Sequence, residues 1–200
     1  MRDQPDRKTS NPESDPGTSE VEKADIELGK KIASKRHHPA VKAAAGAAKF
    51  GDQGPLYALS AGVIAVGVAS RDRRVADCGL AMLGAIAVAD VGKRIAKSLV
   101  RRTRPHILID QDRYDADTGG SDDKQEQSFP SGHTACTVAA ARSLSRHVPE
   151  TMGVAAAAAA VVALSRVAEG KHWPLDVAAG AVIGLAAEAL SALFYEQCRR

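Results

Sequence analysis

The chain has 200 residues, a formal net charge of +3 and an aromatic content of only 4%. This length suits one domain, which can bury a substantial core without disulfide bonds. Small residues, alanine above all, dominate the composition, and they favour closely packed helices over a β-sandwich with large core side chains. The basic residues between positions 93 and 104 have no interleaved aromatic residues, which argues against nucleic acid as a partner.

The cysteines and the amino-terminal segment exclude further classes of protein. Cys78, Cys136 and Cys198 lack CxxC spacing and nearby His/Cys ligands, so the sequence predicts neither a disulfide framework nor a zinc site. We expect them to pack as small apolar residues. Residues 1–35 begin with a charged stretch rich in Pro, Ser and Asp, without the apolar core of a secretory signal. We expect a disordered polar tail at 1–35 and a helical domain at 36–200.

The first apolar segments of the domain suit a membrane. Residues 39–51 are apolar but contain Lys42 and Lys49, a pattern suited to a helix on a membrane surface. Residues 54–70 carry no charge and are nearly as long as the roughly 20 residues that span a bilayer. A basic turn, RDRR, follows, and we expect the next helix to end at Pro105.

The second half of the chain continues the helical pattern after a polar interruption. Residues 106–129 are acidic without the spacing of a calcium loop, so we expect a solvated loop there. Three more helices are predicted, at 133–147, 152–166 and 175–196. The sequence therefore predicts an all-α, transmembrane bundle of five to six helices. A soluble bundle stays an alternative, because acidic residues interrupt the apolar runs at Asp77, Asp90 and Glu188.

Lys97 and Arg104 form the first of three clusters that suit an anion. They lie seven residues apart, so two turns of helix would bring both cations to one face. An ammonium and a planar guanidinium together suit a tetrahedral oxyanion. Basic residues at a helix end also complement the helix dipole or anchor in lipid headgroups, and this pair alone does not decide between the two readings.

The tetrapeptide PSGH lies where the polar loop enters a helix. Ser131 can donate a hydroxyl, Gly132 lets the backbone approach a ligand, and free amides at the helix start face an anion. His133 can give or take a proton beside this phosphate cradle. A helix entry that happens to precede a histidine is the alternative.

The segment SRVAEGKHWPLD places a third group of charges between two apolar helices. Arg166 can donate to two oxygens of one anion. Pro174 suits a first helical turn, which puts Asp176 within reach of His172. A carboxylate on one imidazole nitrogen makes the other a better nucleophile. The alternative is that His172 and Asp176 are only an interfacial pair.

The three segments in this order, KSLVRRTRP, PSGH and SRVAEGKHWPLD, resemble the three-part signature of the type 2 phosphatidic acid phosphatase superfamily. The resemblance extends over residues 54–196 in helix layout. It implies that His172 attacks phosphorus, that Asp176 orients it, and that His133 protonates the leaving oxygen and then activates water. It also implies metal-independent chemistry without a cofactor, and nonbridging oxygens held by Lys97, Arg104, Ser131, Gly132 and Arg166.

The same resemblance sets the expected substrate class and location. Its membrane members hydrolyse lipid phosphates and pyrophosphates, and the apolar helices favour that branch over soluble acid phosphatases and vanadium haloperoxidases. A non-catalytic phospholipid-binding membrane protein is a further alternative, although binding alone needs no nucleophile. We expect a bacterial inner-membrane enzyme whose site faces the periplasm or exterior, since basic residues gather at the opposite end: RDRR, Arg146, Arg199 and Arg200.

Overall fold

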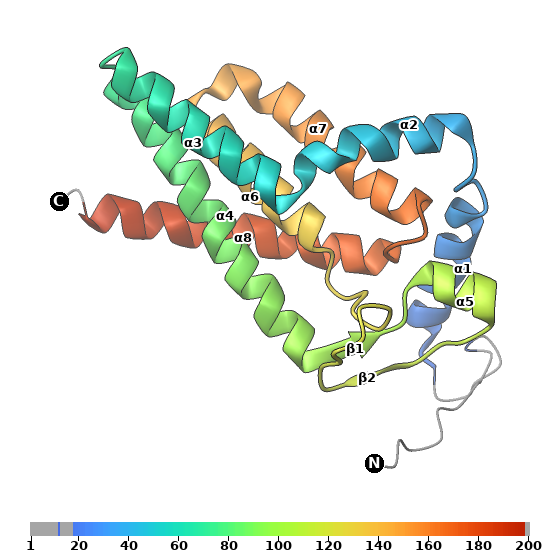
Figure 1. Ribbon diagram of the computed structural model, residues 1–200. Helices are drawn as coiled ribbons and strands as arrows, with labels where there is room; N and C mark the ends of the chain where they lie inside the picture. The colour runs from blue at the N-terminus through green and yellow to red at the C-terminus, as the bar shows by residue number, and fades with distance from the viewer. Residues whose placement is uncertain (1–11, 13–17, 199–200) are drawn as a thin grey trace.

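The computed structural model describes residue 12 and residues 18–198, and this part of the chain is a helical bundle with one small β-hairpin (Figure 1). The all-α prediction is confirmed. The strands are β1 (Val100–Arg102) and β2 (Ala116–Thr118). The α-helices are α1 (Glu20–Ala33), α2 (Pro39–Ala48), α3 (Gln53–Ala69), α4 (Arg73–Leu99), α5 (Pro105–Gln111), α6 (Gly132–His147), α7 (Met152–Ala168) and α8 (Pro174–Cys198).

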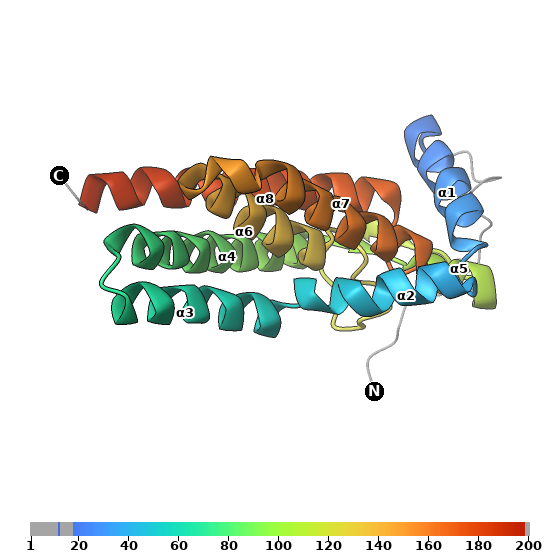
Figure 2. The same ribbon diagram turned by 90° about the horizontal axis from the view of Figure 1, so that it is seen from above.

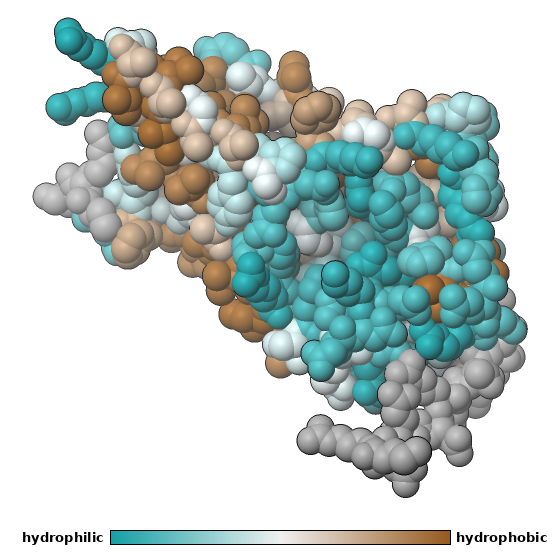
Figure 3. Space-filling model, in the orientation of Figure 1, coloured by the Kyte–Doolittle hydropathy of each residue, from teal (hydrophilic) through white to brown (hydrophobic). Residues whose placement is uncertain are grey.

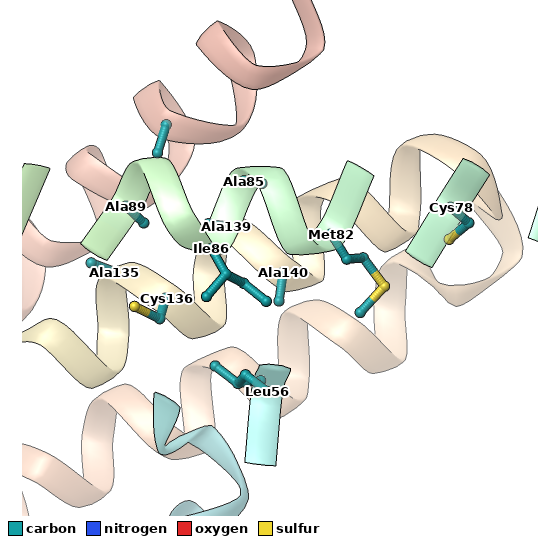
Figure 4. Close-up of a cluster of buried hydrophobic side chains, with 11 residues drawn as sticks. Leu56, Cys78, Met82, Ala85, Ile86, Ala89, Ala135, Cys136, Ala139 and Ala140 are labelled. Atoms are coloured by element: carbon teal, nitrogen blue, oxygen red, sulfur yellow. The ribbon is translucent and has the colours of Figure 1, made fainter. Parts of the chain in front are cut away.

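Three helices, α4, α6 and α8, form the centre of the bundle, and α3 and α7 pack on its sides (Figures 1 and 2). The buried apolar core lies mainly between α4 and α6, with Leu56 of α3 and Ala187 of α8 against it (Figure 4). Cys78 and Cys136 belong to this core, which confirms their predicted packing role. The side chain of Cys198 lies outside the described residues.

Glycines allow α8 to approach α6 closely. A Cβ atom added at Gly180 would lie 2.5 Å from the carbonyl oxygen of Ser131, and one at Gly184 would lie 2.5 Å from that of Ala135. Only a residue without a side chain fits such a contact. Since Ser131 precedes α6 directly, this packing fixes the PSGH segment against α8.

The face of the bundle shown in Figure 3 is divided between an apolar and a polar end. Three helical segments are long and apolar enough to cross a membrane: Arg73–Leu99, Pro149–Ala168 and Pro174–Gln197. The segment expected to span best forms α3, which is apolar but has 17 residues. Exposed apolar side chains on these helices suit contact with lipid.

The disordered tail expected at 1–35 is wrong for its second half, because residues 20–33 form α1. Ser19 caps this helix by accepting a hydrogen bond from the backbone N–H of Glu22 at 3.2 Å. The helix buries Ile26, and Gly29 packs directly against the Trp173 ring. The rest of the expected tail, residues 1–11 and 13–17, lies outside the described residues.

The chain between Leu99 and Pro130 also differs from the expectation. The helix ends at Leu99, not at Pro105, because residues 100–102 pair as β1 with the antiparallel strand β2. Pro105 begins α5, where its missing N–H costs no hydrogen bond. The expected solvated loop therefore contains a helix and a strand.

Candidate active site

A pocket of about 440 Å³ lies at the polar end of the bundle and is strongly cationic. Five of its lining residues are Lys or Arg, against one carboxylate, Asp52. It is lined by Gly51, Asp52, Gln53, Gly54, Lys93, Lys97, Arg104, Gly132, His133, Cys136, Arg166, Lys171 and His172. Six of the eight predicted site residues are among them, namely Lys97, Arg104, Gly132, His133, Arg166 and His172. Such a lining favours an anion.

Backbone hydrogen bonds join the first predicted segment to the second. The residues before PSGH lie alongside β1 and its continuation: Arg102 N–H donates to Glu126 O at 2.7 Å, and Arg104 N–H donates to Gln125 O at 2.9 Å. Ser128 N–H donates to Arg102 O at 2.9 Å. Arg104 thus reaches the pocket from an extended segment rather than from the end of α4. The predicted proximity of Lys97 and Arg104 is right, but the predicted helical spacing is wrong.

The third segment is fixed to both of the others. Trp173 is fully buried, and its indole N–H donates to Thr103 O at 2.8 Å. Gly170 turns the chain with φ of +70°, and its carbonyl accepts from His106 N–H at 2.9 Å. Ser131 N–H donates to Asp176 O at 2.9 Å. These bonds hold the three segments as one unit around the pocket.

His172 is buried and lines the pocket, with one ring nitrogen already committed. Its Nδ1 lies 2.7 Å from Ser128 O, which can only accept, so Nδ1 carries the hydrogen. The Nε2 lone pair is therefore free to act as a nucleophile. Burial, and then the positive charges of Arg104 and Lys97, hold the pKa of His172 well below its ordinary value of 6.5, so the ring is neutral.

Asp176 does not hydrogen-bond directly to His172, the contact by which it was expected to orient the ring. Its Oδ2 is 3.9 Å from His172 Nδ1, beyond hydrogen-bond distance, and the fully buried carboxylate does not line the pocket. Instead it accepts from Ser128 Oγ at 2.5 Å and from Trp173 N–H at 2.8 Å. Asp176 is therefore linked to His172 only indirectly, through Ser128, whose carbonyl oxygen accepts the hydrogen bond from the imidazole.

Arg102 links Asp176 to α1 in a buried charge network that the sequence did not reveal. Its guanidinium donates to Asp176 Oδ1 at 2.9 Å, to Asp25 Oδ2 at 2.8 Å and to Tyr114 Oη at 3.1 Å. Asp25 also accepts from Leu175 N–H at 2.9 Å. The attraction of Asp176 raises the pKa of Arg102 against the effect of burial. The first helix thus supports the wall of the site.

The second histidine has a partner that sequence analysis also missed. His133 Nε2 contacts the Asp52 carboxylate, which follows η1 (Lys49–Gly51) and precedes α3. This contact fixes the orientation of the ring at the pocket wall. No motif marks Asp52 in the linker GDQG, so no local signal could have identified it.

The cations of the pocket differ in how far their hydrogen bonds are satisfied. Lys97 Nζ donates to Gln127 O at 2.7 Å. Within the described part of the chain, the buried Nε atoms of Arg104 and Arg166 have no hydrogen-bond partner. Burial lowers the pKa of Arg104, but a guanidinium stays charged in a protein. Buried charged donors without acceptors suit the oxygens of a bound anion.

Ser131 is the other residue placed differently from the prediction. Its side chain is fully buried, accepts from Thr134 Oγ1 at 2.9 Å and does not line the pocket. Gly132 does line it, with the Lys93 side chain 2.8 Å from where a Cβ would be. Lys93 itself pairs with Asp90 at 2.7 Å and was also missed, although it lies one turn before Lys97 on the same helix face.

Comparisons with known proteins agree with this geometry. The sequence model of the PAP2 superfamily matches residues 79–200. A decaprenylphosphoryl-5-phosphoribose phosphatase of Mycobacterium tuberculosis is 34% identical over 143 residues, which are 70% of this chain and 72% of that protein.

Two crystal structures share the fold. Aquifex aeolicus LpxE is 25% identical with a TM-score of 0.61, over 84% of this chain and 93% of that one. A transmembrane PAP2-type phosphatidylglycerolphosphate phosphatase from Bacillus subtilis is 24% identical with a TM-score of 0.67, over 90% of this chain and 89% of that one.

Proposed function

The chain belongs to the PAP2 superfamily, and from this membership and the pocket we propose that it hydrolyses a phosphomonoester or pyrophosphate on a membrane lipid through a phosphohistidine at His172. The observation that carries the proposal is the neutral, buried His172 at the wall of a cationic pocket, with Nδ1 held by Ser128 O and Nε2 free.

The first step forms a covalent intermediate. His172 Nε2 attacks phosphorus, a nitrogen–phosphorus bond forms, and the bond from phosphorus to the lipid oxygen breaks. His133, oriented by Asp52, protonates the leaving oxygen so that the lipid departs as a neutral alcohol. When the substrate is a pyrophosphate, the same proton goes to the departing phosphate.

The second step returns the enzyme to its starting state. His133 takes a proton from water, the water oxygen attacks phosphorus, and the bond from phosphorus to His172 breaks to release inorganic phosphate. Lys97, Arg104, Arg166 and the Gly132 N–H at the start of α6 stabilise the nonbridging oxygens during both displacements. Ser131 and Asp176 act behind the pocket wall as positioning residues.

The distribution of apolar and charged surface supports a membrane enzyme with the site on the outer face. The span-length helices place the basic turn at Arg71, Arg73 and Arg74 at the end opposite the pocket, where the positive-inside tendency puts the cytoplasm. Arg146 is paired with the buried Glu188 at 2.5 Å, so it contributes less to this asymmetry. Arg199 and Arg200 lie outside the described residues.

The relative from M. tuberculosis makes a phosphorylated polyprenyl lipid one candidate substrate, beside phosphatidate and phosphatidylglycerol phosphate. Phosphate release from these lipids and from undecaprenyl pyrophosphate, by detergent-purified protein with EDTA present, tests the proposal. We expect release from at least one lipid, its loss in His172→Ala, and normal release in His147→Ala, a matched histidine at the far end of α6. Full activity in His172→Ala would contradict the mechanism, and activity lost to EDTA would contradict metal independence.

A further inference from the structure

We propose that a second anion-binding subsite adjoins the catalytic pocket and that the substrate is a lipid with two anionic phosphoryl groups, one hydrolysed at His172 and one held at this subsite. The inference rests on the proposed phosphatase function and narrows its substrate class.

The subsite is a separate pocket of about 390 Å³ between α2 and the end of α7. The two helices pack against each other at this end of the bundle (Figure 2). The pocket is lined by Arg36, His37, Val41, Lys42, Ala45, Gly46, Lys49, Arg166, Glu169 and Lys171. Ala45 and Gly46 are small, which leaves room between the cationic side chains.

The charge of this pocket is mostly positive. Five lining residues are Lys or Arg, and Glu169 is the one carboxylate among the lining residues. Glu169 is already shared between Lys171 at 2.5 Å and Arg166 at 3.3 Å. Arg36 pairs with Asp110 outside the pocket lining. The pocket therefore keeps an excess of positive charge that suits an anion.

Lys42 and Lys49 supply the unbalanced charge. They lie seven residues apart on α2 and the turn that follows it, so both face the same pocket. No acidic residue occurs in α2, and within the described residues no ion pair is found for either lysine. Both lysines are exposed and line the same pocket as Arg166.

The two pockets are adjacent and have lining residues in common, so two groups of one substrate could occupy both pockets at once. Arg166 and Lys171 line the catalytic pocket and the second pocket alike. A phosphomonoester seated at His172 would therefore place a nearby phosphodiester, or a second phosphoryl group, beside Lys42 and Lys49. A lipid with a single phosphate would leave the second pocket without an anion from the substrate.

The test compares two lipids with the same acyl chains in the same detergent micelles. Phosphatidylglycerol phosphate carries a phosphodiester beside its terminal phosphate, whereas phosphatidate carries one phosphate only. The variant is Lys42→Gln with Lys49→Gln. The matched control is Lys31→Gln with Lys35→Gln, which removes the same charge from exposed positions that line neither pocket.

We expect the ratio of kcat/KM for phosphatidylglycerol phosphate to that for phosphatidate to fall about two- to thirtyfold in the pocket variant, since each of the two exposed charge pairs contributes a factor of about 1.4 to 5. The control variant should keep the wild-type ratio. The effect should shrink at high salt, which screens exposed charges.

An unchanged ratio, or an equal loss on both lipids, would overturn the subsite. Inhibition of both reactions to the same extent by added phosphatidylglycerol would instead mean that the pocket holds a bulk membrane lipid, which also overturns it. Binding of both lipids to His172→Ala, measured without hydrolysis, tests the subsite independently of the proposed catalytic activity. Loss of the preference for phosphatidylglycerol phosphate in that binding, on removing Lys42 and Lys49, supports the subsite even if neither lipid is hydrolysed.

Discussion

Replacing Arg102 with methionine should destabilise the protein far more than the same change at its neighbour Arg101. Arg102 is buried and neutralises two buried carboxylates, with side-chain exposures of 7% for Arg102, 3% for Asp25 and 0% for Asp176. Methionine fills much of the same space but leaves both carboxylates facing each other without a cation. Breaking a buried pair in this way costs about 3–5 kcal/mol, or a fall in Tm of roughly 10 °C for a chain of this size.

Arg101→Met is the matched control. Arg101 also pairs with two carboxylates, Asp115 at 2.9 Å and Asp117 at 3.0 Å, but on the exposed side of the hairpin, where its side chain is 35% exposed. Exposed pairs contribute only about 0–1 kcal/mol each. Thermal unfolding in detergent, followed by the fluorescence of Trp173, measures both variants.

The deficit in Tm of Arg102→Met should also depend on pH. Burial already raises the pKa of Asp25 in the folded wild type, and Arg102 opposes this rise. Without Arg102 that folded-state pKa rises further above its unfolded value, so the penalty is present at high pH and disappears as pH falls through the raised value. The deficit in Tm of Arg102→Met should therefore be smaller at pH 5 than at pH 8. Adding Asp25→Asn to Arg102→Met should recover part of it.

The same variant tests whether the network positions the nucleophile. Since Asp176 holds Ser128 and Ser128 holds His172, kcat should fall at temperatures where the variant is folded, with little change in KM. Equal stability of Arg101→Met and Arg102→Met, or a deficit in Tm that does not change with pH, would show that Arg102 does not neutralise the two buried carboxylates.

Three further predictions concern the pocket and its support. Arg166→Lys should lower kcat/KM by about 10²-fold in steady-state phosphate release, because lysine lacks the fork geometry, and an unchanged value would remove Arg166 from the phosphate ligands. Burial and two cations lower the pKa of His172, so the acid limb of the pH profile of kcat/KM should lie below pH 6.5 once titration of the substrate is corrected for. An acid limb above pH 6.5 would contradict a neutral nucleophile. Gly180→Ala should cost about 1–3 kcal/mol by overpacking against Ser131 O, whereas Gly62→Ala, which meets nothing within 4 Å, should not reduce the Tm.

Local patterns in the sequence predicted the fold class and six of the residues at the pocket. Apolar runs identify the helices, and short motifs mark Gly132, His133, Arg166 and His172 because each lies in a helix end or a tight connection. The first helix carried an unused signal: Ser19 and Glu22 have the spacing of a capping box. Its acidic residues gave the segment the composition of a solvated tail.

The remaining features depend on contacts between distant segments. Whether residues 100–102 continue a helix or form a strand depends on pairing with residues 116–118. The partners Asp25, Asp52 and Arg102 reach the site across 74 to 81 residues of sequence, as shown by the pairs Arg102–Asp176, Asp25–Arg102 and Asp52–His133. The sequence spacing predicted a direct contact between Asp176 and His172, whereas in the structure Ser128 hydrogen-bonds to both of them.

In the proposed mechanism, His172 carries the phosphoryl group between the two displacements. Rapid acid-free quenching of the enzyme with phosphatidate or another hydrolysed lipid, followed by mass spectrometry of the peptide that contains His172, tests it most directly. We expect an acid-labile phosphoryl group on His172 in the wild type and none in His172→Ala. Turnover of the lipid with no phosphoryl group on His172 at any quench time would argue against this intermediate.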